Sequence, residues 1–242
     1  MQNINKLKKN IVFIVFISFL NSVFAGAYED FFKAVKSDNT KVIQSLLQRG
    51  FDPNTVNPDG VPALVLALRE PSLQVAELLL SRPETRVEFR NDKDESPLML
   101  AALKGYLPLV KKLVERDADV NKTGWTPLHY AATGGHVAVI EHLLEHSAYI
   151  DAESPNGSTP LMMAAMYGSP ESVKQLIQAG ADLTLKNHLG MTALDFAIQG
   201  NRRNSQELIE TGLERLAARK ARSNADRNAP SSASGHGIPQ TR

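Results

Sequence analysis

The 242-residue chain contains no cysteine, a single tryptophan and only 6% aromatic residues, and it has one long apolar run, residues 11–20. The missing cysteine excludes disulfides, thiolate metal sites and a cysteine nucleophile. The apolar run, IVFIVFISFL, is short for a membrane span, which takes about 20 residues. It suits a targeting segment better than a spanning helix.

A large excess of either charge is also missing, since the formal net charge is +1. The charge is unevenly distributed, however. Residues 1–25 hold three lysines and no acid, and residues 214–242 hold six basic against two acidic residues, which leaves a net charge of −6 on residues 26–213. An acidic body repels phosphate groups, so a nucleic-acid partner is not expected.

Residues 1–25 have the order of a secretory signal peptide. A basic start precedes the apolar run, and Val23-Phe24-Ala25 offers small residues at the positions that a signal peptidase reads, so cleavage is predicted between Ala25 and Gly26. The mature protein is then expected in the periplasm or outside the cell, with no membrane attachment. An uncleaved membrane anchor and a buried first helix are the alternatives.

Residues 124–148, GWTPLHYAATGGHVAVIEHLLEHSA, predict two short helices joined by a tight turn. Pro127 suits the first turn of a helix, where its missing N–H costs nothing, and Gly134-Gly135 suits a helix end. The VAVIEHLL segment that follows carries an apolar stripe at helical spacing. An isolated pair cannot bury its apolar side, so similar neighbours are needed.

The chain supplies such neighbours at a period near 33 residues. The WTPLHYAA string of the first helix recurs as VPALVLA, ESPLMLAA, STPLMMAA and MTALDFA. The second helix recurs as VIQSLLQRG, VAELLL, LVKKLVERD and VKQLIQAG. These patterns, in phase between about residues 28 and 213, resemble the ankyrin repeat.

The resemblance implies an all-α ankyrin-repeat solenoid, with about six stacked helix-turn-helix units and short β-turn fingers, over residues 26–216. The units, numbered one to six below, are predicted at 28–57, 58–91, 92–122, 123–154, 155–187 and 188–216. Residues 217–242 are predicted to form a basic, disordered tail because they contain few large apolar residues. Together with the signal peptide, the chain resembles an exported bacterial ankyrin-repeat protein.

Three departures from the repeat pattern predict local differences. Between Ala118 and Thr126 the chain is about three residues short, which predicts a clipped turn. Asp117 and Ser147, like Pro83, replace the glycine that usually closes the second helix, so these ends are expected to fray or bend differently. The charged segment 82–94 is expected to be the loosest connection.

Residues 142–146 form an H-x-x-E-H string, which can hold a metal ion because residues four apart share one helix face. Leu143 and Leu144 are expected to pack inward, which places His142 and His146 on the solvent face. The string is therefore interpreted as surface, and no metal site or cofactor is predicted. The resemblance implies that His129 and His136 hydrogen-bond turn backbone and tie one unit to the next.

The resemblance also implies a partner on the concave side, formed by the turn tips and the first helices. The family's variable positions, carried over to this chain, give as partner-binding residues Trp125, Met166, Tyr167, Met191, Thr133, Leu103, Lys104 and Arg69. The first four are expected to cluster over three adjacent units, with tryptophan and tyrosine as anchors. Alternatively, Trp125 folds onto the clipped turn and stabilises it.

The sequence thus predicts a non-enzymatic, exported module that binds or modulates another protein and is a monomer. A host-directed secreted effector is one alternative. A metal-dependent enzyme that uses His142, Glu145 and His146 is another.

Overall fold

The computed structural model describes residues 26–91 and 93–228, so the predicted signal peptide lies outside the described part. Within that part, helices are the only regular structure apart from an isolated bridge between Val56 and Pro62. A helix over residues 26–36 is followed by α2 (Thr40–Gln48), α3 (Ala63–Arg69), α4 (Leu73–Leu80), α5 (Pro97–Lys104), α6 (Leu107–Glu115), α7 (Pro127–Gly134), α8 (Val137–Glu145), α9 (Pro160–Tyr167), α10 (Pro170–Gln178), α11 (Ala193–Gln199) and α12 (Arg203–Asn228).

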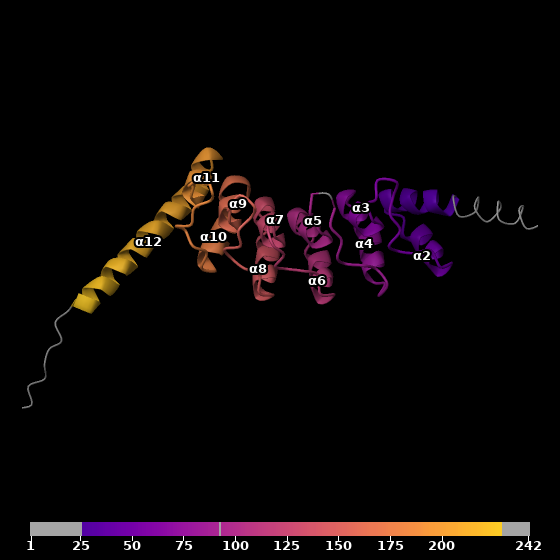
Figure 1. The fold of residues 1–242 in the computed structure, drawn as a ribbon, viewed down its shortest axis with the longest axis horizontal. Coiled ribbons are helices and arrows are strands. Elements are labelled where there is room, and N and C mark those ends of the chain that lie inside the picture. The colour runs from indigo at the N-terminus through magenta and orange to yellow at the C-terminus, as the bar shows by residue number, and fades with distance from the viewer. Residues whose placement is uncertain (1–25, 92, 229–242) are drawn as a thin grey trace, which may run out of the picture.

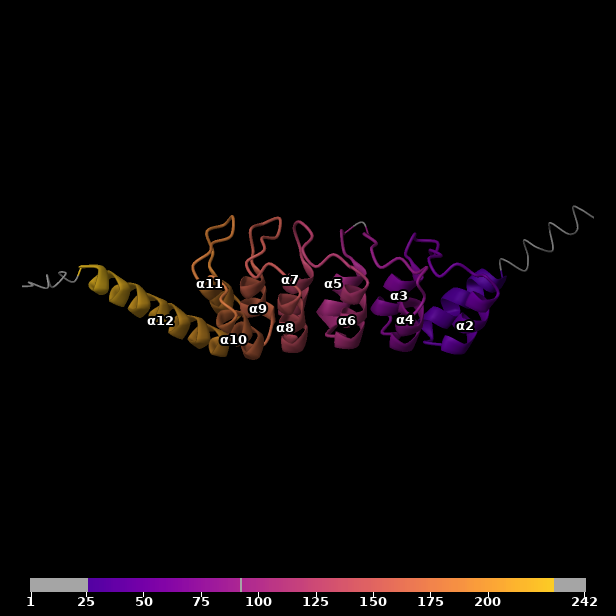
Figure 2. The same ribbon diagram turned by 90° about the horizontal axis from the view of Figure 1, so that it is seen from below.

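The helices stack as pairs into an elongated array (Figure 1). One row, called the first-helix row, consists of the helix over residues 26–36 with α3, α5, α7, α9 and α11. The second-helix row consists of α2, α4, α6, α8 and α10, and neighbours contact one another along each row. The fingers that connect the pairs all project from one side (Figure 2). The predicted all-α solenoid of about six units is confirmed.

The first helices start alike because the same capping chemistry is repeated. Ser96, Thr126, Thr159 and Thr192 each accept, through the side-chain oxygen, the N–H of the residue three positions later. This satisfies one backbone donor that a helix start leaves unpaired. Proline follows the cap in α5, α7 and α9, where it has no N–H to lose.

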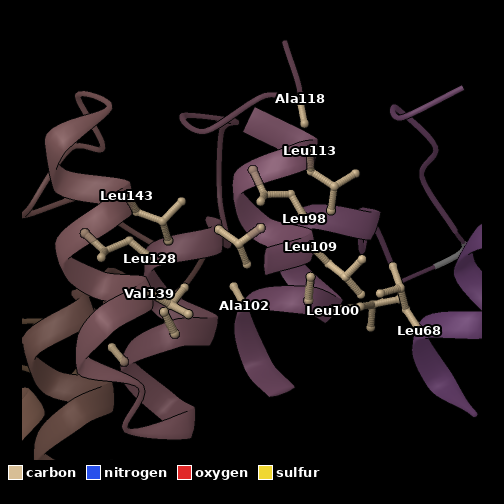
Figure 3. Packing of buried hydrophobic residues seen from close by; sticks show 14 of the residues in the cluster. Leu68, Leu98, Leu100, Ala102, Leu109, Leu113, Ala118, Leu128, Val139 and Leu143 are labelled. Atoms are coloured by element: carbon tan, nitrogen blue, oxygen red, sulfur yellow. The ribbon is translucent and has the colours of Figure 1, made fainter. Parts of the chain in front are cut away.

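The core runs through the array without a break between units. Leu98, Leu128 and Leu161 hold the same position in α5, α7 and α9, and each is fully buried. Figure 3 shows Leu128 beside Leu143 of its own unit, with Leu98 and Leu113 of the preceding unit alongside. Burying such a side chain contributes roughly 2 kcal/mol, and the neighbouring unit supplies part of that burial. Each unit is therefore stable only beside another.

The expected change at two helix ends is wrong. Asp117 and Ser147 adopt φ values of 62° and 64°, in the left-handed region that Gly50 and Gly180 occupy at the corresponding positions with 87° and 99°. The chain therefore ends α6 and α8 as glycine would, although a residue with a side chain is strained there by about 1 kcal/mol. Each end is closed by a backbone hydrogen bond, from the Ala118 N–H to the Leu113 carbonyl at 3.0 Å and from the Ala148 N–H to the Leu143 carbonyl at 2.9 Å.

The start of the segment expected to be loose, residues 82–86, is fastened by side chains of both neighbouring units. The guanidinium of Arg116 donates hydrogen bonds to four backbone carbonyls, those of Leu80, Arg82, Pro83 and Thr85. From the preceding unit, the amide of Asn54 donates to the Glu84 carbonyl at 2.8 Å and accepts the Arg86 N–H at 2.7 Å. Arg116 thus closes the end at which Pro83 replaces glycine.

The predicted tail does not begin at residue 217, because α12 continues to Asn228. Ser205 and Ile209 are buried against the array, whereas residues 217–223 are exposed, and the helix projects from the end of the array (Figure 1). The segment LERLAARKA is rich in strong helix formers, which explains the extension. Residues 229–242 lie outside the described part. None of the described helices is both long and apolar enough to cross a membrane.

Candidate partner-binding surface

Four of the fingers are closed by the same tight turn. In each, the N–H of the first residue donates to the carbonyl four positions later, and the side-chain oxygen of that first residue accepts N–H groups of the turn. The first residues are Asn57, Asn91, Ser154 and Asn187. Such turns present their tips as fixed surfaces, because their backbone groups are already paired.

Each finger takes the number of the unit whose first helix follows it, and the fourth finger, residues 118–126, is built differently. It is the one that the sequence predicted to be clipped. Here the Lys122 side chain is only 7% exposed, and its ammonium group bonds the carboxylate of Asp94 at the tip of the third finger. The hydrogen bond and positive charge of Lys122 lower the pKa of Asp94. A buried lysine thus fastens the short finger to its neighbour, a contact that sequence reasoning missed.

Trp125 lies in this short finger and is partly buried. Its ring meets the imidazole of His129 edge to face, with centroids 5.3 Å apart and an interplanar angle of 77°. This packing agrees with the alternative interpretation, in which Trp125 stabilises its own turn. Its role in partner binding stays a prediction.

His129 and His136 connect the fourth unit to both neighbours, which confirms the role that the resemblance implied. His129 is fully buried, and its Nε2 donates to the Ser158 carbonyl of the fifth unit at 2.9 Å. Its Nδ1 therefore accepts the N–H of Thr126 at 3.2 Å. Burial lowers the pKa of His129 to about 4, so the imidazole is neutral at pH 7. His136 Nε2 donates to the Leu103 carbonyl of the third unit at 2.9 Å.

The structure does not bring the four residues of the predicted cluster together. Trp125 and Met191 directly precede the N-caps of α7 and α11, at the finger ends of these helices. Met166 and Tyr167 are the last residues of α9, at the C-terminal end of a first helix, opposite to the finger end. A helix of this length spans about 12 Å, so the two pairs are well separated.

Most of the predicted partner-binding residues lie together at the C-terminal ends of the first helices. Six of them end their first helices or lie in the last turn, and we call them the C-terminal row: Arg69, Leu103, Lys104, Thr133, Met166 and Tyr167. Arg69, Lys104 and Tyr167 are exposed, and the others are partly buried. Arg202 fixes the end of α9, because its guanidinium donates to the carbonyls of Met166 at 3.0 Å and Tyr167 at 3.1 Å.

Polar side chains of three adjacent units meet near this row. The Arg69 guanidinium lies 3.6 Å from the Glu95 carboxylate, which accepts the Tyr130 hydroxyl at 3.4 Å. Burial, followed by the charge of Glu95, raises the pKa of Tyr130 to about 12. These contacts hold the first helices of units two to four in a fixed relation, and no pattern in the sequence indicated them.

Leu189 is a surface residue that the sequence analysis overlooked. It stands at the tip of the sixth finger and is 81% exposed. The signal was an apolar side chain inside an Asn-His-Leu-Gly turn, where polar residues usually stand. Together with Tyr167, which is 52% exposed, it leaves large apolar surface in water on the fifth and sixth units.

His142 is not on the solvent face, contrary to the interpretation of the H-x-x-E-H string. Its side chain is only 12% exposed, and burial, with the nearby charges of His146 and Lys111, lowers its pKa. Glu145 and His146 are exposed. The string thus has one partly buried and two exposed members.

Comparison with known proteins identifies relatives over most of the chain. The model for ankyrin repeats (3 copies) matches residues 31–123, 76–154, 121–187 and 149–217. The mouse (Mus musculus) ankyrin repeat and SAM domain-containing protein 6 is 35% identical over 176 residues, 70% of this chain and 19% of that protein. Human (Homo sapiens) SH3 and multiple ankyrin repeat domains protein 2 is 29% identical over 181 residues, 73% of this chain and 10% of that protein.

The similarity extends to an enzyme and to a solved structure. A palmitoyltransferase of Lachancea kluyveri is 28% identical over 174 residues, 53% of this chain and 24% of that protein. The chain thus spans less than a quarter of each of these three relatives. An ankyrin repeat domain from Acinetobacter baumannii AYE, solved by crystallography, matches with a TM-score of 0.64 and 25% identity, over 75% of this chain and 96% of that one.

Proposed function

Because this chain belongs to the ankyrin-repeat family, we propose that it is a non-enzymatic module that binds another protein through its fingers and the C-terminal row. Ankyrin repeats generally mediate protein–protein interaction, and the proposal assigns that role to these residues. The observation that carries it is the exposure of Tyr167 and Leu189, at 52% and 81%, in the C-terminal row and at a finger tip, while the stacked helices bury a continuous apolar core. Large side chains held on fixed backbone are typical interface anchors.

The proposed interaction takes place outside the cytoplasm, in the periplasm or after secretion, with the protein as a monomer. The support is the order of residues 1–25, a basic start, an apolar run and small residues. Fractionation of the producing cells, with N-terminal sequencing of the exported protein, tests this part. A sequence that starts at Gly26 is expected, and one that retains Met1 would contradict cleavage.

Affinity capture from an extract of the exported fraction tests the binding surface. The wild-type chain is compared with a Tyr167→Ala, Leu189→Ser double variant and with a Tyr149→Ala control. Tyr149 is 67% exposed but lies between α8 and the closed turn of the fifth finger, residues 154–158, so it belongs neither to a finger tip nor to the C-terminal row. A partner should be retained by wild type and control and lost by the double variant. A partner retained by all three would place the interface elsewhere.

A further inference from the structure

The last turn of α8 and the C-cap residue that follows it carry three side chains that can bind metal. His142, Glu145 and His146 each offer one ligand atom, and these atoms all lie within 4.8 Å of one another. The two imidazole centroids are 4.2 Å apart, and His142 Nδ1 lies 4.0 Å from Glu145 Oε2. Residues three and four positions apart are neighbours on one helix face, so the backbone itself holds the group together.

A backbone hydrogen bond prepares His146 for coordination. Its Nδ1 lies 2.8 Å from the carbonyl oxygen of His142. A carbonyl can only accept, so Nδ1 carries the hydrogen, and Nε2 keeps a free lone pair. Metal-binding histidines are commonly oriented in this way, with the second ring nitrogen donating to a carbonyl or carboxylate.

His142 occupies the seam between α6 and α8. Its Nε2 is buried and has no hydrogen-bond partner within the described part of the chain, which is a costly arrangement for a polar atom. Lys111 and Glu115 of α6 act on this side chain with opposite charges, so the facing helix adds little net charge. Nothing in the stacking of the units requires a histidine here.

We propose that His142, Glu145 and His146 bind one divalent transition-metal ion of the zinc class, with water completing the coordination. Two imidazoles and one carboxylate are a ligand set that Zn²⁺ takes, whereas Ca²⁺ and Mg²⁺ prefer oxygen ligands. Metal bonds of about 2.0–2.2 Å require the ligand atoms to approach one another. The exposed Glu145 can do so by rotation of its side chain, while His146 keeps its hydrogen bond to the His142 carbonyl.

The ion fastens the end of α8 where the third and fourth units meet. Asn121 of the third unit donates from its side-chain amide to the Ser147 carbonyl at 2.7 Å and accepts the Tyr149 N–H at 2.8 Å, directly after this turn. The site lies in the second-helix row, apart from the C-terminal row. Metal binding therefore does not depend on the proposed partner surface.

Titration of Zn²⁺ into tag-free, chelator-stripped full-length protein, followed by calorimetry, tests the proposal. One ion per chain is expected, and the midpoint of thermal unfolding should rise with Zn²⁺ because the ion binds the folded chain. Glu145→Gln and His146→Gln change exposed side chains and should each weaken binding at least about tenfold. His188→Gln removes an exposed histidine of the sixth finger and should leave binding unchanged.

Co²⁺ supplies an independent readout, since its absorption spectrum reports coordination by nitrogen and oxygen ligands. The spectrum should be lost in His146→Gln and retained in His188→Gln. Absence of Zn²⁺ binding by the wild type, or equal affinity in wild type and His146→Gln, would overturn the proposal. Circular dichroism of each variant confirms that the compared chains are folded.

Discussion

The fourth and fifth units, α7–α8 and α9–α10, start their first helices with the same threonine cap. They differ in the side chain three residues after it, which is His129 in the fourth unit and Met162 in the fifth. Thr126 and Thr159 each accept the N–H three residues later at 3.4 Å. In the fifth unit Met162 follows, and its sulfur lies 3.4 Å from the Thr159 nitrogen. In the fourth unit His129 both closes the cap and reaches Ser158 of the next unit. The same backbone is thus stabilised by an apolar side chain in one unit and by a buried, titratable one in the other.

Acid should reveal this difference most strongly. The pKa of His129 is about 4 in the folded chain and about 6.5 in an unfolded one. The unfolded state therefore binds a proton first, so the stabilisation is fully present above pH 6.5 and is lost as the pH falls toward 4. The loss reaches about 3 kcal/mol. Denaturant unfolding of wild type and His129→Met at pH 7 and pH 4.5 measures it.

The His129→Met variant should show a smaller pH dependence than the wild type over this range. Carboxylates such as Asp94 also contribute to acid sensitivity, but they are present in both chains and cancel in the comparison. If the wild type and His129→Met lost the same free energy of unfolding between pH 7 and pH 4.5, His129 would not titrate as its burial requires.

At pH 7 the same His129→Met substitution should cost about 1 kcal/mol, the net value of one hydrogen bond between neutral groups. The cost is modest because the Ser158 carbonyl keeps a second donor, the Ser154 N–H at 3.0 Å. The reverse substitution, Met162→His, sharpens the comparison. It should bring an imidazole toward the Met191 carbonyl and give the fifth unit an acid sensitivity of its own.

Ser147→Gly should stabilise the fourth unit by about 0.5–1 kcal/mol, because glycine adopts a positive φ without strain. The fifth unit has Gly180 at the matching position, with φ 99°, and no neighbouring atom lies within 4 Å of the place that a Cβ would take there. Gly180→Ser is therefore the matched control and should destabilise by a similar amount, through backbone strain alone. Thermal unfolding of both variants measures the pair, and shifts of the same sign would contradict the argument.

The repeat made the fold predictable, whereas contacts between distant residues did not follow from it. The TPLHYAA string and the apolar stripes indicated helix pairs that must stack, and the structure has them. The burial of Lys122 and the seam around His142 depend on residues of the adjacent units. The position of a residue within one unit does not report these neighbours. Composition was misleading for residues 217–228, because a polar segment was equated with disorder although its residues favour helix.

The expected clustering of Trp125, Met166, Tyr167 and Met191 was wrong for a related reason. Positions carried over from the repeat pattern identify the correct helices, but Trp125 and Tyr167 stand at opposite ends of theirs. Sequence spacing within one unit therefore does not establish proximity between units. Leu189 was missed because the variable positions of the repeat pattern predicted Met191 in this finger and not Leu189.

Lys122→Met should have the smallest effect on stability. The fifth finger is closed by its own backbone, with the Ser154 N–H on the Ser158 carbonyl at 3.0 Å, whereas the fourth relies on Lys122 and Asp94. Removing a buried ammonium removes its desolvation cost together with its attraction to Asp94, so the free energy of unfolding should remain nearly unchanged. The pKa of Asp94 should rise, because its hydrogen bond to Lys122 is the main cause of the lowering. Carboxyl NMR measures this rise, and a large loss of stability would instead show that the ion pair holds the short finger in place.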